Sequence, residues 1–336
     1  MQNFTKLFLT SLALTLAACD TGDLGADFGN EATEFRPGGL GGFNLNTSFL
    51  GGMEHGEVDL MGKVHKDVRL TQVCMYGRHG VCIFPGKDSL WVEAGEIIGQ
   101  KGGVTYRGEY FIKSRWYLEL DYDRDGVVDS TVENVIIAAA QNATVQTGIS
   151  YWDYSWAYDS KKATGLLTKY IKVSETPTPV CEVDVDTGSV GAVVLENTSI
   201  DTTPTTKAIV ENVPNVMFIA CHSGAAGKAP TWGYVLYDLG HKPYTNVLRV
   251  IRADYCNNGE SFTEPGQKVA VTDALGISDQ YDASFTVEGM ASITDGWVCL
   301  DKPRLADISD VTSACDIPAC KAKLGDPGFD IMTQNP

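Results

Sequence analysis

The nine cysteines of this 336-residue chain constrain its fold more than any other feature of the sequence. No two of them have the Cys-x-x-Cys spacing that is typical of a zinc ribbon or of a thioredoxin-type redox site. Disulfide bonds persist in oxidising compartments and are rare in the cytosol. The role of the cysteines therefore depends on whether the chain is exported.

The N-terminus has the layout of an export signal. Lys6 precedes a short apolar run, and two small alanines stand directly before Cys19. The apolar run is too short to serve as a transmembrane helix. The Leu-Ala-Ala-Cys sequence resembles a bacterial lipobox, and this resemblance implies cleavage before Cys19 and acylation of its thiol and its new amine. We therefore expect residues 1–18 to be a lipoprotein signal peptide, with ordinary secretion as the alternative.

Lipidation would fix where the mature protein resides. Two or more acyl chains hold a protein stably on a bilayer, whereas a single chain holds it only marginally. We expect an extracytoplasmic protein that is attached through Cys19 to the inner or the outer membrane of a bacterial cell envelope. No later stretch of the sequence is long and apolar enough to add a membrane span.

With Cys19 used for lipidation, an even number of cysteines remains, which is typical of a disulfide framework in an exported protein. They are Cys74, Cys82, Cys181, Cys221, Cys256, Cys299, Cys315 and Cys320. Cys74 and Cys82 flank a hairpin-like stretch, and Cys315 and Cys320 flank Asp-Ile-Pro-Ala, so we expect these two local bridges. The other four cysteines would then cross-link one region. A bridge that closes a long loop contributes roughly 2 to 4 kcal/mol, mostly by restricting the unfolded chain.

The composition is that of an acidic globular protein. A hydrophobic content of 43% is enough for substantial cores, and the length favours two domains. The formal net charge is −17, and the chain has no basic run. Such a chain lacks the electrostatic footprint of a nucleic-acid-binding protein, which leaves cations and basic partners open.

Short runs rich in β-branched and aromatic residues, punctuated by glycine, predict a β protein. They cover residues 67–76, 89–98, 104–112, 115–122, 216–221, 231–238, 246–255 and 283–289. Residues 131–143 fit a strand or a helix, and no segment has a long, well-capped helical pattern.

We therefore predict an all-β fold of two β-sandwich-like or barrel-like domains stapled by disulfides. Residues 19–46 are rich in glycine and are expected to form a flexible tether. The N-terminal β domain would cover residues 47–176, and the prolines at 177 and 179 mark a boundary. A second β domain would cover residues 181–305, followed by a cysteine-stapled tail over 306–336.

The clearest ligand signal is the stretch Asp-Tyr-Asp-Arg-Asp-Gly-Val-Val-Asp. It resembles the front of an EF-hand calcium loop, with carboxylates at positions 1, 3, 5 and 9, a turn glycine at position 6 and a carbonyl at position 7. The candidate ligands of a Ca²⁺ ion are Asp121, Asp123, Asp125, Val127 and Asp129.

This stretch departs from the EF-hand at position 12, where Val132 stands and Glu133 follows one residue late. The preceding residues also indicate a strand rather than a helix. We therefore expect a calcium loop between two strands, completed by Glu133 or water, with a structural rather than a catalytic role. The alternative is a solvated acidic turn.

An aromatic stripe follows, because Trp152, Tyr154, Trp156 and Tyr158 share one face if the segment is a strand. An exposed stripe would suit stacking on sugars or on another partner. We expect a buried stripe, since large aromatic side chains seldom form exposed patches.

The sequence offers no complete catalytic motif. Residues 218–234 resemble a phosphate loop and a nucleophile elbow, but His222 and Cys221 occupy the glycine positions that these motifs require. The five histidines are scattered without the spacing of a zinc site.

The stretch Arg-Ala-Asp-Tyr-Cys combines charges, a tyrosine and a cysteine. If it is a strand, Arg252 and Asp254 share a face and can form an ion pair. Cys256 then precedes the turn-forming Asn-Asn-Gly-Glu-Ser. We expect a strand that ends in a disulfide-stapled turn. In the alternative, Asp254 or Glu260 acts as a catalytic acid or base.

Together with Phe-Ile-Ala-Cys-His-Ser upstream and Gly-Trp-Val-Cys-Leu downstream, this stretch resembles the ADYC domain of exported bacterial proteins and lipoproteins. The resemblance covers roughly residues 181–305, with the motif residues Arg252, Ala253, Asp254, Tyr255 and Cys256 in place. The family has no assigned reaction, so the resemblance implies no activity and favours a structural role for the motif.

The resemblance also bears on the disulfides. It implies two further cysteines where Ala229 and Val247 stand in this chain. If those two positions are paired in the family, one whole bridge is absent here, and Cys181, Cys221, Cys256 and Cys299 form two bridges.

Three functions fit these observations. The leading hypothesis is a non-enzymatic, lipid-anchored envelope protein that binds a protein or glycan partner or has a structural role. The second is an exported, glycan-directed hydrolase that uses carboxylates such as Asp254, Glu260 or Glu119 in a cleft. The third is a calcium-dependent adhesin built on the same scaffold.

Overall fold

The computed structural model describes residues 44–45, 47–48, 50–75, 80–111, 114–141, 150–159, 178–179, 181, 191–200 and 209–336. For residues 44–45, 53–54, 109, 133–141, 150–159 and 178–179 it describes the backbone alone. The predicted signal peptide, Cys19 and the predicted tether up to residue 43 lie outside these ranges.

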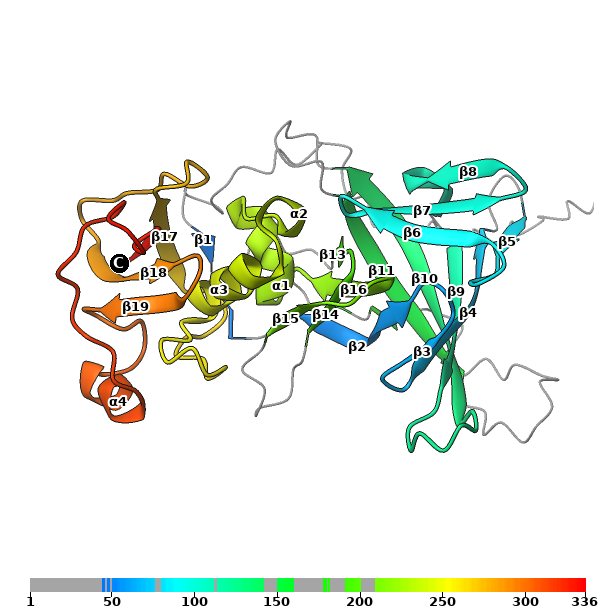
Figure 1. The fold of residues 1–336 in the computed structure, drawn as a ribbon, viewed down its shortest axis with the longest axis horizontal. Helices are drawn as coiled ribbons and strands as arrows, with labels where there is room; N and C mark the ends of the chain where they lie inside the picture. The colour runs from blue at the N-terminus through cyan, green and yellow to red at the C-terminus, as the bar shows by residue number, and fades with distance from the viewer. Residues whose placement is uncertain are drawn as a thin grey trace, which may run out of the picture. The chain divides into compact units, whose positions relative to one another are not determined.

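The described chain is mostly β, and its named strands pair antiparallel (Figure 1). The largest sheet has ten strands: β2 (Gly52–Asp59), β3 (Val64–His65), β4 (Val68–Met75), β5 (Val81–Ile83), β9 (Ser114–Leu120), β10 (Ser130–Gln141), β11 (Ser150–Asp159), β12 (Thr178–Pro179), β13 (Ala192–Leu195) and β16 (Val216–Cys221). Strands from both sides of the boundary predicted near residue 177 therefore share one sheet.

Three smaller sheets complete the β structure of the described residues. The five-stranded sheet has the order β1 (Asn44–Leu45), β17 (Lys268–Asp273), β20 (Ile331–Asn335), β18 (Thr286–Ser292) and β19 (Gly296–Leu300). A three-stranded meander contains β6 (Ser89–Glu93), β7 (Glu96–Lys101) and β8 (Val104–Arg107), and a ribbon contains β14 (Thr198–Ile200) and β15 (Val210–Asn212). The predicted tail thus supplies an inner strand, β20, and the end of the predicted tether supplies β1.

The ten-stranded sheet is covered on both faces at β13 and β16. Val194 and Ile219 belong to one core with the meander β6–β8, whereas Val193 and Phe218 belong to a second core with the helices and the five-stranded sheet. Successive residues of a strand point to opposite faces, so near-continuous apolar runs are needed here. The strand Val-Met-Phe-Ile-Ala-Cys has such a run, and its prediction is confirmed.

The prediction of an all-β fold is wrong in detail, because the segments predicted as strands at 231–238 and 246–255 are largely helical. The helices are η1 (Gly108–Phe111), α1 (Ala225–Lys228), η2 (Ala229–Trp232), α2 (Leu236–Leu239), α3 (His241–Arg252) and α4 (Ile308–Ala314). The side chains of Tyr244, Val247, Leu248 and Ile251 are buried along one face of α3, a spacing of three and four residues. None of the described helices has the length and apolarity to cross a membrane.

Residues 131–143, which fitted a strand or a helix, lie mostly in β10, and β10 forms a long hairpin with β11 (Figure 1). The described strands form no closed barrel. Instead, side chains link the two end strands β2 and β3 of the largest sheet. Glu57 lies 2.9 Å from His65 Nε2 and accepts a hydrogen bond of 2.7 Å from Lys66 Nζ.

All eight predicted cysteines form disulfides: Cys74–Cys82, Cys181–Cys221, Cys256–Cys315 and Cys299–Cys320. The Cys74–Cys82 prediction is confirmed, since the two residues are register partners in β4 and β5. The Cys315–Cys320 prediction is wrong. Cys315 is bonded to Cys256, the last residue of the motif, and Cys320 is bonded to Cys299 in β19. These two bridges attach the tail to residues 181–305 and do not close a loop within the tail.

Candidate functional site

The aspartate-rich loop connects β9 to β10, so it lies between two strands as predicted. Asp121 N–H donates to the carbonyl oxygen of Asp67 at 2.9 Å, and Asp129 N–H donates to the carbonyl oxygen of Leu120 at 2.8 Å. These two bonds fix both ends of the loop to the sheet.

The loop is closed by its own carboxylates. Asp121 accepts N–H bonds from Asp125 at 3.1 Å and from Gly126 at 2.9 Å, and Asp129 accepts one from Tyr122 at 2.8 Å. Gly126 has φ +88°, in the left-handed region that favours glycine. This backbone conformation explains why glycine stands at the turn position of the predicted calcium loop.

Three of the predicted ligands converge. Asp121, Asp123 and Asp129 each offer one carboxylate oxygen, and these oxygens lie within 4.8 Å of one another. Oxygens that bind one Ca²⁺ ion at roughly 2.3–2.6 Å can be up to about 5 Å apart, so the three fit a single ion. The donor set, all hard oxygen, also suits Ca²⁺.

Asp125 is placed differently, and the Val127 carbonyl stays a predicted ligand. Asp125 lies outside the converging group, and its Oδ1 accepts a hydrogen bond of 2.7 Å from Val127 N–H. The side chain of Glu133 lies outside the described residues, so completion of the shell by Glu133 stays a prediction. The side chains of Trp152, Tyr154, Trp156 and Tyr158 also lie outside the described residues, although their backbone forms β11 as predicted.

A shallow hollow adjoins the loop. Its lining includes Val64, Arg69, Asp121 and Val127. The two valines are 59% and 57% exposed, and Arg69 forms an ion pair with Glu119. Glu119, one of the carboxylates considered for a hydrolase, is thus already paired.

The Arg-Ala-Asp-Tyr-Cys stretch is the C-terminal end of α3 and the turn after it, not a strand. Ala253 has φ +50° and ψ +40°, and its N–H donates to the carbonyl oxygen of Val250 at 3.2 Å. Asp254 N–H donates to the carbonyl oxygen of Arg249 at 2.9 Å. This pair of bonds is a Schellman motif, which ends a helix through one left-handed residue.

Asp254 organises the turn. Its side chain is fully buried, and its two oxygens accept N–H bonds from Asn258 at 2.9 Å and Gly259 at 2.8 Å. Burial raises its pKa, and these two bonds oppose the rise only in part. The predicted ion pair with Arg252 is replaced by a 3.8 Å contact between Arg249 Nε and Asp254 Oδ2, because the helix end puts Arg252 elsewhere.

Arg252 instead connects separate segments. It donates to the carbonyl oxygens of Ser48 and Gly259, each at 2.9 Å. Its own carbonyl oxygen accepts a hydrogen bond of 2.7 Å from the Ser261 hydroxyl. The N-terminal segment that follows β1 is therefore held against the motif.

Tyr255 belongs to a buried polar cluster. Its hydroxyl donates to Glu288 Oε1 at 2.6 Å and accepts the Arg304 N–H at 2.9 Å. Burial and the neighbouring Glu288 raise the pKa of the hydroxyl. The ring packs edge-on against Trp297, with 4.8 Å between centroids, and stacks on Phe262.

Arg304 completes the end of α3. Its guanidinium donates to the carbonyl oxygens of Val250 at 2.8 Å and Ile251 at 2.9 Å and contacts Glu288 at 2.8 Å. The last carbonyls of a helix have no partner within the helix, and buried ones need another donor. Sequence reasoning missed Glu288 and Arg304, because they lie on and beyond β18 with no local spacing to the motif.

The side chains of Asp254, Tyr255 and Cys256 are thus engaged within the protein. Asp254 has both oxygens bound to backbone N–H groups, Tyr255 is held between Glu288 and Arg304, and Cys256 is in a disulfide. The third carboxylate considered for a hydrolase, Glu260, is exposed in the turn that follows. The arrangement joins α3, β18 and β19 and the tail.

Comparison with known proteins gives one match. The model of a family described as the ADYC domain matches residues 108–306. No curated protein and no solved structure matches the chain.

Proposed function

The chain belongs to the ADYC domain family, and from this premise we propose that it is a lipid-anchored envelope protein without catalytic activity. Its ADYC region would serve as a binding or structural scaffold, and its aspartate loop would bind Ca²⁺. Anchoring through Cys19 would hold the protein at the inner or outer membrane of a bacterial envelope, on the extracytoplasmic side.

The absence of catalysis is supported by the way the motif is used. General acids and bases must reach the proton that they transfer, within hydrogen-bond distance or through one water molecule. Asp254 and Tyr255 are 0% and 1% exposed, and their polar atoms are already bonded within the protein. These two side chains therefore support the fold rather than a reaction.

Calcium binding is supported by one observation above the others: the convergence of carboxylate oxygens from Asp121, Asp123 and Asp129 within 4.8 Å. Three carboxylates this close repel one another in the absence of a cation. A ligand that binds only the folded state stabilises it by about 2.7 kcal/mol at a hundredfold excess over Kd. Calcium would thus act as a structural clamp on the β9–β10 connection.

The test is a calorimetric Ca²⁺ titration of the chain from residue 20 onward, accompanied by melting curves. The Asp123→Asn/Asp129→Asn variant replaces two of the three converging carboxylates by neutral amides, which are weaker ligands of Ca²⁺. The Glu211→Gln/Glu264→Gln variant removes two exposed carboxylates elsewhere and serves as the charge-matched control. We expect saturable binding and a raised Tm in the parent and the control only. Equal binding in all three proteins, or no heat in the parent, would reject the calcium site.

The anchor is tested separately in the full chain expressed in a Gram-negative host. The parent should fractionate with membranes and carry the mass of added acyl groups at Cys19, whereas Cys19→Ala should lose both. A parent protein found in the soluble fraction without added mass would contradict lipidation.

A calcium-dependent adhesin is the second candidate. The observation in its favour is the hollow beside the loop, in which exposed Val64 and Val127 lie next to Arg69 and Asp121. A partner bound there would contact the metal loop directly. Adhesion to glycan or protein surfaces that is lost on Ca²⁺ chelation and in Val64→Asp would support this function, and adhesion insensitive to both would exclude it.

A further inference from the structure

The turn that follows the motif contains an asparagine followed by a glycine, Asn258 and Gly259. No other asparagine in the sequence precedes a glycine. Asn258 is also exposed. In such a pair the backbone nitrogen of the glycine can attack the side-chain amide carbon of the asparagine, and glycine favours this step because it has no side chain to hinder the approach. The sequence context of Asn258 therefore favours deamidation.

The reaction needs no reagent other than water. The Gly259 nitrogen loses its proton and forms a bond to Asn258 Cγ, and the side-chain amide nitrogen leaves as ammonia. Water then opens the resulting succinimide ring at one of its two carbonyls. The product has aspartate or isoaspartate in place of Asn258, and isoaspartate carries an extra carbon in the backbone.

The attacking nitrogen is engaged in the folded structure. Gly259 N–H donates to Asp254 Oδ2 at 2.8 Å, and Asp254 is fully buried. The nitrogen attacks only after it has lost this proton. A carboxylate that accepts the N–H opposes the loss, because it holds the proton on the nitrogen and repels the anion that would be left. This contact therefore hinders the first step of the reaction.

The other polar groups of the pair are bonded as well. Asn258 N–H donates to Asp254 Oδ1 at 2.9 Å, and Asn258 Oδ1 accepts the N–H of Glu260 at 2.9 Å. The carbonyl oxygen of Gly259 accepts a hydrogen bond of 2.9 Å from Arg252 Nη2. Ring closure removes the Gly259 N–H and makes the Asn258 amide part of a ring, so it cannot take place while all of these bonds are kept.

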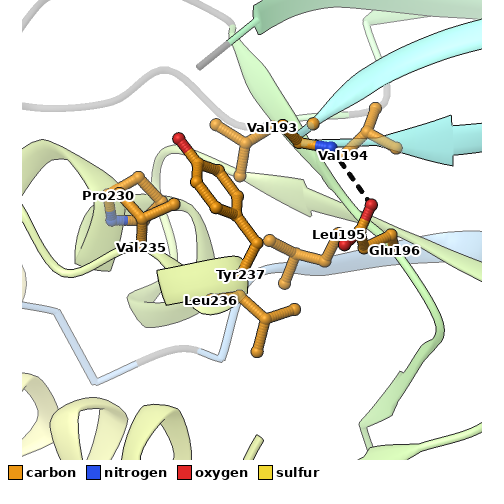
Figure 2. Close-up of a pocket in the computed structure, with 10 residues that line it drawn as sticks. Val193, Val194, Leu195, Glu196, Pro230, Val235, Leu236 and Tyr237 are labelled. Atoms are coloured by element: carbon orange, nitrogen blue, oxygen red, sulfur yellow. Dashed lines mark hydrogen bonds between the residues drawn. The ribbon is translucent and has the colours of Figure 1, made fainter. Parts of the chain in front are cut away.

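Another carboxylate holds the β6–β7 turn in a comparable way. Glu196 Oε2 accepts the N–H of Ala94 at 3.1 Å (Figure 2). The centre of that turn consists of Ala94 and Gly95, which have no side-chain amide. The contact there protects no reactive pair, whereas the contact of Asp254 lies on the atom that would react.

We propose that Asn258 is a deamidation site that Asp254 keeps unreactive while the turn is folded. The aspartate of the motif thus protects the asparagine–glycine pair as well as organising the turn. When the turn opens, Gly259 N–H loses its acceptor and the reaction proceeds. Deamidation then adds a carboxylate beside Asp254 and Glu260, and the added negative charge disfavours reclosure of the turn. The modification therefore accumulates with the time that the turn spends open.

The test is incubation of the protein at mildly alkaline pH, folded in buffer and unfolded in guanidinium chloride, followed by mass spectrometry of its peptides. We expect Asn258 to deamidate at least about tenfold more slowly in the folded protein, because reaction through an open state is slowed by the fraction of time that the turn is open. Asn215 is exposed and precedes a valine, so it serves as the internal control and should keep its amide in both samples. Equal rates at Asn258 in the two samples would overturn the proposal.

Two variants assign the protection to the carboxylate. Asp254→Ala removes both acceptors, and we expect its Asn258 to react at least about tenfold faster than in the folded parent. Arg304→Lys weakens the same junction but keeps Asp254, so its Asn258 should stay as slow as in the parent. Equal acceleration in both variants would assign the protection to general stability and would overturn the role of Asp254.

Hydrogen exchange in the parent protein decides the matter even if Asp254→Ala fails to fold. We expect slow exchange of the Gly259 N–H, and a deamidation rate at Asn258 that rises with denaturant in step with this exchange. A Gly259 N–H that exchanges as fast as in an unstructured peptide, or a deamidation rate that does not follow its exchange, would overturn the proposal.

Discussion

At Ala253 the backbone adopts φ +50°, a conformation that costs an ordinary L-residue about 1–2 kcal/mol and a β-branched residue more. Glycine is the usual residue at this position of a helix end. Here the methyl group is fully buried against the core that contains Tyr255 and Trp297. A small side chain satisfies both the backbone and the packing.

Substitution at Ala253 should separate these two requirements. Ala253→Val adds a branched side chain to a left-handed, fully enclosed position, and we expect a loss of about 2 kcal/mol or more in the free energy of unfolding. Ala253→Gly relieves the backbone but removes a buried methyl worth about 0.8 kcal/mol, so its stability should stay within about 1 kcal/mol of the parent. Urea denaturation measures both, and a harmless Ala253→Val would contradict the observed backbone.

Glu57 makes stability depend on pH. Burial alone would raise its pKa, but hydrogen bonds from His65, Lys66 and Ser199 outweigh burial and lower the pKa below its ordinary value of 4.5. For a carboxylate whose folded-state pKa is lowered, the unfolded state binds more protons as the solution becomes acidic. Its contribution to stability is therefore full above pH 4.5 and is lost as the pH falls through the lowered pKa.

Replacing this carboxylate should make the free energy of unfolding less dependent on pH in acid. We expect Glu57→Gln to be less stable than the parent at pH 7 and to lose less additional stability between pH 5 and pH 3. The exposed Glu211→Gln serves as the control and should follow the parent curve. The measurement is the free energy of unfolding across this range, and parallel curves for Glu57→Gln and the parent would show that Glu57 does not contribute to the pH dependence of stability.

At the scale of the elements, most strands were predictable because their alternation and glycine punctuation are local. The ambiguity of residues 131–143 was resolved by long-range pairing, since β10 is held between β9 and β11. Helix α3 was misread because β-branched residues and the lack of a stop glycine concealed it. The spacing of Tyr244, Val247, Leu248 and Ile251 and a proline in the first turn were the signals that could have revealed it.

The end of α3 depends on Arg304, which lies 52 residues beyond Arg252. Arg304→Lys keeps the charge but loses the planar fork that bonds Val250, Ile251 and Glu288 together. We expect a loss of about 2 kcal/mol or more in unfolding free energy, with faster hydrogen exchange in the last turn of α3. Arg107→Lys, which alters an exposed ion pair, should cost clearly less than Arg304→Lys. Equal effects of the two substitutions would contradict the role of Arg304.

At the scale of the whole molecule, the pairing of the disulfides does not follow distance along the sequence. Cys74 and Cys82 were predictable because one hairpin brings them together. Cys315 and Cys320 are close in sequence, but the tail runs along β19, where Leu300 N–H donates to the carbonyl oxygen of Pro318 at 2.9 Å. Each tail cysteine therefore meets a different distant partner, and no local spacing encodes that choice.

The bridges should contribute unequally. Cys256–Cys315 spans 59 residues and Cys74–Cys82 spans 8. In the chain-entropy model this ratio makes the longer bridge worth about 1.8 kcal/mol more. Paired Cys→Ser variants, compared by denaturant unfolding, should show the larger loss for Cys256/Cys315. A larger loss for Cys74/Cys82 would contradict the ranking of the bridges by loop length.

The candidate sites also differ in how far the sequence predicts them. The convergence of Asp121, Asp123 and Asp129 was predictable because these residues belong to one short loop, whereas Asp125 lies outside the converging group. The cluster of Tyr255, Glu288 and Arg304 was not predictable, since three separate segments supply it. The ADYC tetrapeptide therefore acts as the junction between α3, the C-terminal sheet and the tail.

The most direct test of this junction is the free energy of unfolding of Tyr255→Phe, which keeps the ring and removes only the hydroxyl between Glu288 and Arg304. We predict a loss of about 1–3 kcal/mol, because the buried Arg304 N–H is left without a partner and Glu288 Oε1 keeps only its contact with the Arg304 guanidinium. Tyr281→Phe, at a position that is 61% exposed, should change stability by less than about 0.5 kcal/mol. A Tyr255→Phe variant as stable as the parent would contradict a structural role for the motif.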